Sequence, residues 1–325
     1  MEINGYNLIG ELKGENSGFS RWGFCERNGR EYFIKEFLSP IYPYDAEKRG
    51  VLSKAQIERK IAECKKFEER LTFMYDAINR ASDGNAVRIN HFFRYDSKYY
   101  IVTDKVKSSG LSLEEINALP YKRKKLLCKL ISRAIMRLHE EGFVHADIKH
   151  TNVLVEADEE KQRFSPKIID FDCGFFGIDP PEVGDELNGD PVYLAPEVLI
   201  HMMEEEVALS CKIDIFALGI LFHQYMSGSL PGFDTSTYDY VAEAILDGAE
   251  VTLSPDIPEE FADIIYKMLL PNPAERISAK EVYDMIQIEE LPEIRFGKVR
   301  GKSTLPQGRK LPEGSKLKIY MGNKK

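Results

Sequence analysis

One eight-residue stretch, His-Ala-Asp-Ile-Lys-His-Thr-Asn at 145–152, constrains this chain more than any other part of its sequence. Its Asp147, Lys149 and Asn152 have the residue types and the spacing that position a hydroxyl group for attack on a triphosphate. In such a pattern the aspartate accepts the proton of the hydroxyl, the lysine neutralises the transferred phosphoryl group and the asparagine holds a Mg²⁺ ion. Several fixed positions in so short a segment make the pattern specific.

The overall composition is that of a globular protein. Of the 325 residues, 43% are hydrophobic and 30% are charged, which argues against the fibrous, disulfide-rich and disordered classes. The five cysteines are scattered and form no Cys-x-x-Cys pair, so we expect neither a disulfide framework nor a zinc site. We also expect a cytoplasmic protein, because the N-terminus lacks a signal-peptide pattern and no stretch approaches the roughly 18 consecutive apolar residues of a membrane span.

The charge is distributed unevenly along the chain. The net charge of −9 gives no reason to expect nucleic-acid binding. Residues 295–325 contain ten lysines and arginines and one glutamate, a net charge of +9, which leaves −18 for residues 1–294. We therefore interpret residues 289–325 as a basic tail or linker, suited to bind the acidic body of its own chain or another anionic partner.

The first part of the chain has the pattern of a strand-rich lobe with one long helix. Aromatic and β-branched residues on either side of Asn28-Gly29 predict a hairpin over 21–37, and a similar pattern predicts another over 87–103. Between them, an apolar stripe predicts an amphipathic helix over 51–80. The stripe consists of Ile57, Ile61, Cys64, Leu71, Tyr75 and Ile78.

Two charged residues of this region are candidates for an ion pair. Lys35 lies in the predicted strand Tyr-Phe-Ile-Lys-Glu-Phe, where a solvent-facing lysine is the simpler interpretation. Glu68 falls on the apolar stripe of the predicted helix, and a buried glutamate is unfavourable unless it is paired, so Lys35 is a candidate partner. Glu63, near the edge of the stripe, is a competing partner, and a solvated Glu68 is the remaining alternative.

The second part of the chain is predicted to be mainly helical. Helices are expected over 122–141, with Gly142 as the stop, and over 213–226 and 259–270. An apolar strand over 166–172 ends in carboxylates. Its Asp170 is suited to hold a divalent cation, because Mg²⁺ prefers one or two carboxylates plus phosphate oxygens. A strand hairpin between Asn152 and Asp170 would bring both side chains to one ion.

Together these segments resemble a eukaryotic-type protein kinase of the Ser/Thr branch, over roughly residues 6–288. Residues 145–152 resemble the catalytic loop, Asp170-Phe171-Asp172 resembles the Asp-Phe-Gly site, and Ala195-Pro196-Glu197 resembles the end of the activation segment. Lys149, two residues after the catalytic aspartate, is the Ser/Thr pattern. The resemblance implies an α+β bilobal fold with a small β-rich N-lobe over 1–105 and a larger, mainly helical C-lobe over 106–288.

The resemblance also implies a role for individual residues. Asp147 is the catalytic base, Lys35 and Lys149 offset phosphate charge, and Glu68 is the helix partner of Lys35. Asn152 and Asp170 hold Mg²⁺ or Mn²⁺. The ATP-binding residues are Lys35, Ser17, Gly18, Thr103 as gatekeeper, and Asp104 and Val106 of the hinge, while Asp214, Glu197 and Arg276 give structural support. The expected partner is a protein substrate with a Ser or Thr acceptor.

Four features depart from the family pattern. Ala146 replaces the arginine that, in the family, binds a phosphate on the activation segment. Residues 170–197 contain no Ser or Thr and one tyrosine, Tyr193. We therefore expect activity without phosphorylation of that segment. Asp172 replaces a glycine and adds a carboxylate near the metal site, and Asp190 stands where a threonine usually bridges the catalytic Asp and Lys. A pseudokinase scaffold and a small-molecule kinase are the alternative functions.

Overall fold

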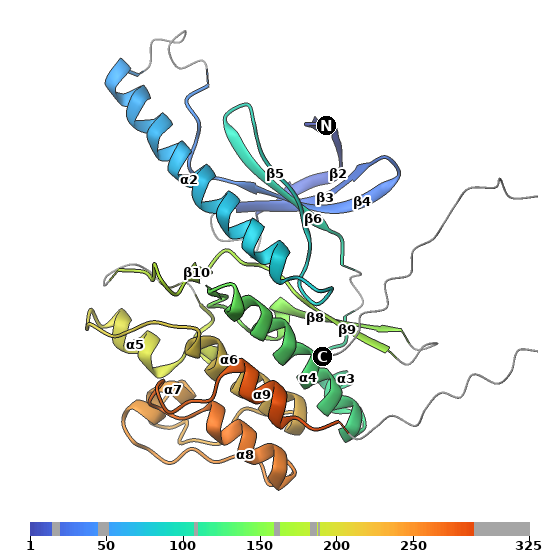
Figure 1. Cartoon of the computed structure of the whole chain (residues 1–325), viewed down its shortest axis with the longest axis vertical. Coiled ribbons are helices and arrows are strands. Elements are labelled where there is room, and N and C mark those ends of the chain that lie inside the picture. The colour runs from blue at the N-terminus through green and yellow to red at the C-terminus, as the bar shows by residue number, and fades with distance from the viewer. Residues whose placement is uncertain are drawn as a thin grey trace, which may run out of the picture. The chain divides into compact units, whose positions relative to one another are not determined.

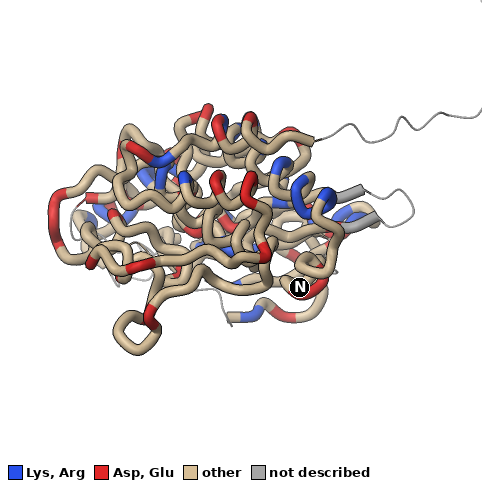
Figure 2. The backbone as a smooth tube through the Cα atoms, turned by 90° about the horizontal axis from the view of Figure 1, so that it is seen from below, with Lys and Arg blue, Asp and Glu red and all other residues tan. Residues whose placement is uncertain are grey.

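The computed structural model describes residues 1–14, 20–44, 52–106, 110–158, 163–182, 187 and 189–288, with the backbone alone at 157–158 and 163–164. The expected basic tail, 289–325, and the expected ATP-binding residues Ser17 and Gly18 lie outside these ranges. No helix within the described ranges is long and apolar enough to cross a membrane. Acidic and basic residues are interspersed along the described chain (Figure 2).

An antiparallel sheet forms the N-lobe, with its six strands in the order β1-β2-β3-β4-β6-β5 (Figure 1). The strands are β1 Glu2–Ile3, β2 Tyr6–Lys13, β3 Ser20–Arg27, β4 Arg30–Phe37, β5 Ile89–Tyr95 and β6 Lys98–Asp104. Both predicted hairpins are confirmed, since β3 pairs with β4 and β5 pairs with β6. Strand β2 was not predicted: its apolar Tyr6, Leu8 and Leu12 alternate, but the exposed Ile9 and Gly10 interrupt the pattern.

Helix α2, Lys54–Ala81, is the long helix predicted over 51–80. It begins at a capping box formed by Ser53 and Gln56. Most of its buried residues lie in the C-terminal half, which packs against β5 and the C-lobe helix α4, Tyr121–Glu140. The predicted stripe is wrong at Ile61, which is 39% exposed, although Ile57 and Cys64 on either side of it along the stripe are buried.

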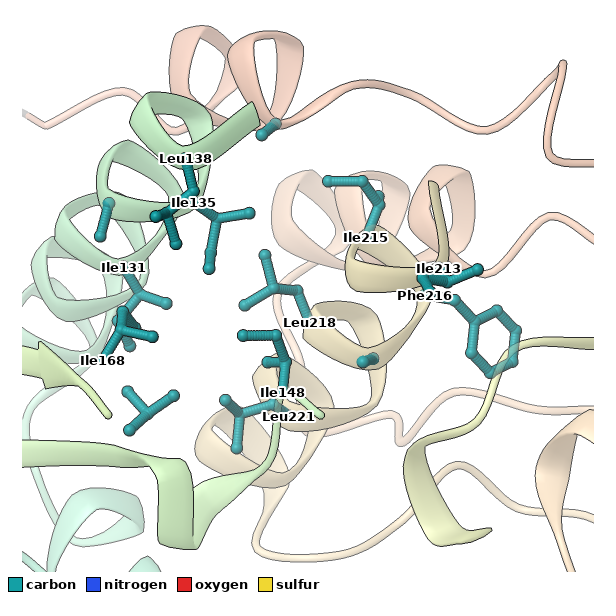
Figure 3. Packing of buried hydrophobic residues seen from close by; sticks show 14 of the residues in the cluster. Ile131, Ile135, Leu138, Ile148, Ile168, Ile213, Ile215, Phe216, Leu218 and Leu221 are labelled. Carbon is teal, nitrogen blue, oxygen red and sulfur yellow. The ribbon is translucent and has the colours of Figure 1, made fainter. Parts of the chain in front are cut away.

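The C-lobe is mainly helical and is built around α6, Lys212–Ser227. Its other elements are α3 Leu113–Asn117, α4, β7 Phe143–Val144, β8 Val153–Asp158, β9 Arg163–Ile168, β10 Phe175–Phe176, α5 Pro196–Met202, α7 Val241–Leu246, α8 Glu259–Met268 and α9 Ala279–Met285. Helix α6 is buried on nearly every side: Leu218 and Leu221 face the side chains of α4, whereas Phe216 points away from α4 (Figure 3). The three predicted C-lobe helices therefore correspond to α4, α6 and α8.

Backbone hydrogen bonds join the two lobes beside the site. The amide of Val87 donates to the carbonyl of Ile168 at 2.9 Å, and the amide of Ile168 donates to the carbonyl of Asn85 at 2.8 Å. The predicted hairpin after Asn152 is present as β8 and β9. The end of β9 is thus held against the N-lobe, with Asp170 just beyond it.

Candidate active site

The catalytic-loop residues form one hydrogen-bonded cluster. The Asn152 amide donates to the Asp147 carboxylate at 2.7 Å and to the Asp147 carbonyl at 2.9 Å. Lys149 Nζ lies 3.0 Å from the same carboxylate. The Asp147 side chain is only 9% exposed, so these contacts hold it in one orientation.

Asp214 of α6 holds the first residues of this loop in place. Its buried carboxylate accepts the backbone amides of His145 and Ala146, each at 2.8 Å, and lies 2.9 Å from His139 Nε2. Burial favours the neutral acid, but His139 and the His145 amide outweigh it and lower the pKa of Asp214. Ala146 has a left-handed φ of 63°, which costs a non-glycine residue about 1–2 kcal/mol, and the Asp214 contacts offset that strain.

Lys35 of β4 reaches the residues that follow β9. Its Nζ lies 3.0 Å from Asp170 Oδ1 and 2.5 Å from Asp172 Oδ2. Burial disfavours the charged amine, but the carboxylates of Asp172 and Asp170 outweigh it and raise the pKa of Lys35. The interpretation of Lys35 as solvent-facing is wrong, because the residue is 8% exposed.

The expected ion pair between Lys35 and Glu68 is not formed. Glu68 accepts a hydrogen bond from the Tyr99 hydroxyl at 2.7 Å and lies 3.9 Å from Arg94 Nε. Glu63, the competing partner, is exposed. Glu68 is half-buried as the stripe predicted, but its partners are the Tyr99 hydroxyl and Arg94 rather than Lys35.

Asn152 and Asp170 have oxygen atoms suited to a hard divalent cation. Among the described residues, the Asn152 side chain makes its two hydrogen bonds through its nitrogen, so its amide oxygen accepts none from them. The Asp170 side chain is 45% exposed, and its backbone has a left-handed φ of 59° two residues after the end of β9. One carboxylate and one amide oxygen fit Mg²⁺ or Mn²⁺, which would complete their coordination with phosphate oxygens and water.

Asp190 does not oppose Asp147 directly. Its backbone amide donates to Asp147 Oδ1 at 3.1 Å, and its side chain accepts the amide of Val192. Lys149 Nζ lies 3.9 Å from Asp190 Oδ2 as well as 3.0 Å from Asp147 Oδ2. The lysine therefore stands between the two carboxylates.

Several other expected site residues have defined contacts in the structure. Arg276 and Glu197 form a buried bidentate pair with distances of 2.7 and 3.0 Å. Thr103 is buried near the end of β6, where Asp104 accepts bonds from Arg30 and Asn90. Sequence reasoning missed Asp172 as a partner of Lys35, although the replaced glycine was a visible signal.

A match to a family model adds to this geometry. The protein kinase domain model matches residues 46–286. This chain belongs to the protein kinase family. The matched part of this kinase starts after β4, so Lys35 lies outside it. The bilobal α+β architecture is the protein kinase fold.

Individual relatives of the kinase agree with this membership. The serine/threonine-protein kinase cds1 of Schizosaccharomyces pombe is 30% identical over 66% of this chain and 47% of its own length. Aurora kinase A-B of Xenopus laevis is 27% identical over 72% of this chain and 53% of its own length. The chain thus spans about half the length of these curated relatives. The structure of the Cydia pomonella granulovirus kinase PK-1 shares the fold, with a TM-score of 0.58 and 18% identity over 87% of this chain and 92% of that one.

Proposed function

We propose that this kinase transfers the γ-phosphoryl group of ATP to Ser or Thr hydroxyls of a protein substrate. The observation that carries the proposal is the cluster in which Asp147 accepts from Asn152 at 2.7 Å and meets Lys149 at 3.0 Å. Lys149 in the Ser/Thr pattern and the Ser/Thr kinases among the relatives support the acceptor class.

Asp147 is the proposed base. The amides of Asn152 and Asp190 donate to its two carboxylate oxygens, which fixes the carboxylate plane toward an incoming hydroxyl. Asp147 orients that hydroxyl and accepts its proton, a contribution of roughly 10² to 10⁴ in rate. Lys149, beside it, offsets the charge of the phosphoryl group as it passes to the acceptor.

ATP and its metal ion are the proposed ligands of the remaining residues. Bound Mg²⁺ would neutralise the phosphate charge that develops during transfer. Asn152 and Asp170 hold the ion through oxygen atoms, and Lys35 contacts the α- and β-phosphates. The proposed adenine contacts are the backbone of 104–106 with Thr103 behind it, and Ser17 and Gly18 are proposed to cover the phosphates.

The test is phosphoryl transfer from γ-³²P-labelled ATP to Ser/Thr peptides by wild type, Asp147→Asn and Asp170→Asn. Each variant is expected to lose at least about 10²-fold in kcat, because one lacks the base and the other a metal ligand. Asp263→Asn, on the exposed face of α8, is the matched control and is expected to retain activity. Unchanged transfer by Asp147→Asn would contradict the assigned base. In a parallel assay with tyrosine peptides, wild-type transfer to tyrosine and none to the Ser/Thr peptides would contradict the acceptor class.

One observation favours a second function, a pseudokinase scaffold. Lys35 is engaged by two carboxylates, Asp170 and Asp172, and both would compete with phosphates for its charge. Calorimetry of Mg·ATP binding separates the two functions. Binding by a wild-type protein that transfers no phosphate to any acceptor would support the scaffold.

A further inference from the structure

Helix α2 supplies no carboxylate to Lys35. In the part of the chain that the structure describes, the ion pairs of Lys35 are those with Asp170 and Asp172. Glu68, the glutamate on the inward stripe, is bound to Tyr99 instead. The role that the family resemblance gave to a helix glutamate is therefore open.

The register of the sheet explains why Glu68 does not reach Lys35. Tyr99, which holds Glu68, is paired across the sheet with Phe37, whereas Lys35 is paired with Ile101. Two residues along a strand correspond to roughly 7 Å. One and two turns further along α2, nearer to the C-lobe, the inward positions are the buried Leu71 and Tyr75. At these positions the helix presents an aliphatic side chain and a tyrosine whose buried hydroxyl makes no hydrogen bond with the described residues, but no carboxylate. Another element must therefore supply the carboxylate partner of Lys35.

Asp172 is held in place by its neighbours in the chain. Phe171 is buried against the rings of Phe143 and His145, with centroids 6.1 and 5.2 Å away. The Gly174 amide donates to the Phe171 carbonyl at 3.0 Å, and a Cβ at Gly174 would clash with the Phe143 ring. This close packing fixes the turn that carries Asp172.

The two carboxylates at Lys35 are not equivalent. Asp170 is the proposed metal ligand, so metal binding would draw its carboxylate away from Lys35. Asp172 is 40% exposed and has no left-handed φ, so an aspartate fits here without the backbone strain that a glycine would relieve. Asp172 is thus the carboxylate that can stay with Lys35 while ATP and metal are bound.

We infer that Asp172 is the positioning residue of Lys35, taking the place of a helix glutamate and aiming the Lys35 ammonium at the phosphates of ATP. The inference rests on the proposed function. Asp172, which stands where the family pattern has a glycine, is then part of the active site.

The kinetic test compares Asp172→Asn, Asp172→Glu and Asp172→Gly with Glu68→Gln, using Glu69→Gln on the exposed face of α2 as a neutral control. Asp172→Asn and Asp172→Gly are expected to lose about 10- to 100-fold in kcat, the value of one charge-assisted contact, with a smaller change in the KM for ATP. Asp172→Glu is expected to recover most of the loss, because it restores the charge. A loss at Glu68→Gln with active Asp172 variants would overturn the inference.

Metal and nucleotide titrations separate this role from two others. A loss in Asp172→Asn that saturating Mg²⁺ repairs would make Asp172 a metal ligand, and tighter Mg·ATP binding with faster transfer would make it a competitor of the phosphates. Either result overturns the inference.

A crystal structure with Mg²⁺ and a non-hydrolysable ATP analogue gives a readout independent of activity. It is expected to keep Asp172 within about 3.5 Å of Lys35 Nζ while Asp170 contacts the metal. A glutamate of α2 at Lys35 would overturn the inference. A wild type that transfers no phosphate would refute the proposed function alone, and the crystal structure would still decide the place of Asp172.

Discussion

At the residue scale, the catalytic loop depends on how its charges are balanced. Asp147 and Asp190 are both acidic, and two nearby carboxylates destabilise each other unless a cation lies between them. Lys149 takes that position, at 3.0 Å from one carboxylate and 3.9 Å from the other. Its contribution to the site therefore includes holding Asp147 and Asp190 together.

This balance predicts coupling between Lys149 and Asp190. Lys149→Met should lower kcat by about 10²-fold, because it removes a positive charge beside the transferred group and the cation between the Asp147 and Asp190 carboxylates. Asp190→Asn added to Lys149→Met should return part of the loss, with a coupling of about 0.5–1 kcal/mol for partly exposed groups. A double-mutant cycle on kcat measures it. Lys149→Met combined with Asp263→Asn should show no coupling, and an equal coupling there would contradict the prediction.

What the sequence predicted at this scale depended on distance along the chain. Asp147, Lys149 and Asn152 lie within one short loop, so their spacing predicted a cluster that the structure contains. The partners of Lys35, Asp170 and Asp172, lie more than a hundred residues away along the chain. Helical periodicity predicts which face of the helix carries Glu68, but not which residues of the sheet lie opposite it. The register of the sheet gives the missing position: Tyr99, the partner of Glu68, lies opposite Phe37, two residues along the strand from Lys35.

At the scale of elements, the C-lobe depends on a buried ion pair. Arg276, just before α9, makes two bonds to Glu197 of α5 and donates to the carbonyls of Leu270, Pro271 and Lys212. Both charged side chains are almost fully buried, at 0% and 2% exposed. Because these bonds satisfy the guanidinium, the pair joins α5, at the end of the activation segment, to α6 and the segment after α8.

Removing one member of this pair should be costly. Arg276→Met is expected to destabilise the protein by about 3–5 kcal/mol, because it leaves Glu197 charged and buried without a partner. Thermal unfolding measures the effect, and Arg276→Met with Glu197→Gln should recover part of it. Lys267→Met, which breaks the exposed α8 pair with Asp263, is the control and should leave the melting temperature nearly unchanged. Equal destabilisation by Arg276→Met and Lys267→Met would contradict the role of the buried pair.

The elements themselves were predicted where their pattern repeats over several turns or strands. Helices α4 and α6 have long apolar patterns, and their predicted ranges agree with the structure to within one residue at each end. Strand β2 and the exposed Ile61 were not predicted correctly. Their burial depends on which element lies opposite, and one chain segment does not carry that information.

At the scale of the whole molecule, contacts with the C-lobe hold both ends of the activation segment. Its start is held where β10 pairs with β7. Near its end, the Asp190 amide binds Asp147 at 3.1 Å and the Tyr193 hydroxyl binds Gln224 of α6 at 2.7 Å. None of these contacts requires a phosphate, and Ala146 has no cationic side chain to receive one.

This arrangement predicts activity without phosphorylation of residues 170–197. Protein treated with a phosphatase, and shown by intact-mass measurement to carry no phosphate, should keep the kcat of the untreated protein. Tyr193→Phe, which removes the one hydroxyl side chain of the segment, should cost about 1 kcal/mol of stability through its lost bond to Gln224 and leave kcat nearly unchanged. Loss of activity on dephosphorylation, together with phosphate mapped to Tyr193, would show that the segment needs a modification that its contacts with Asp147 and α6 do not replace.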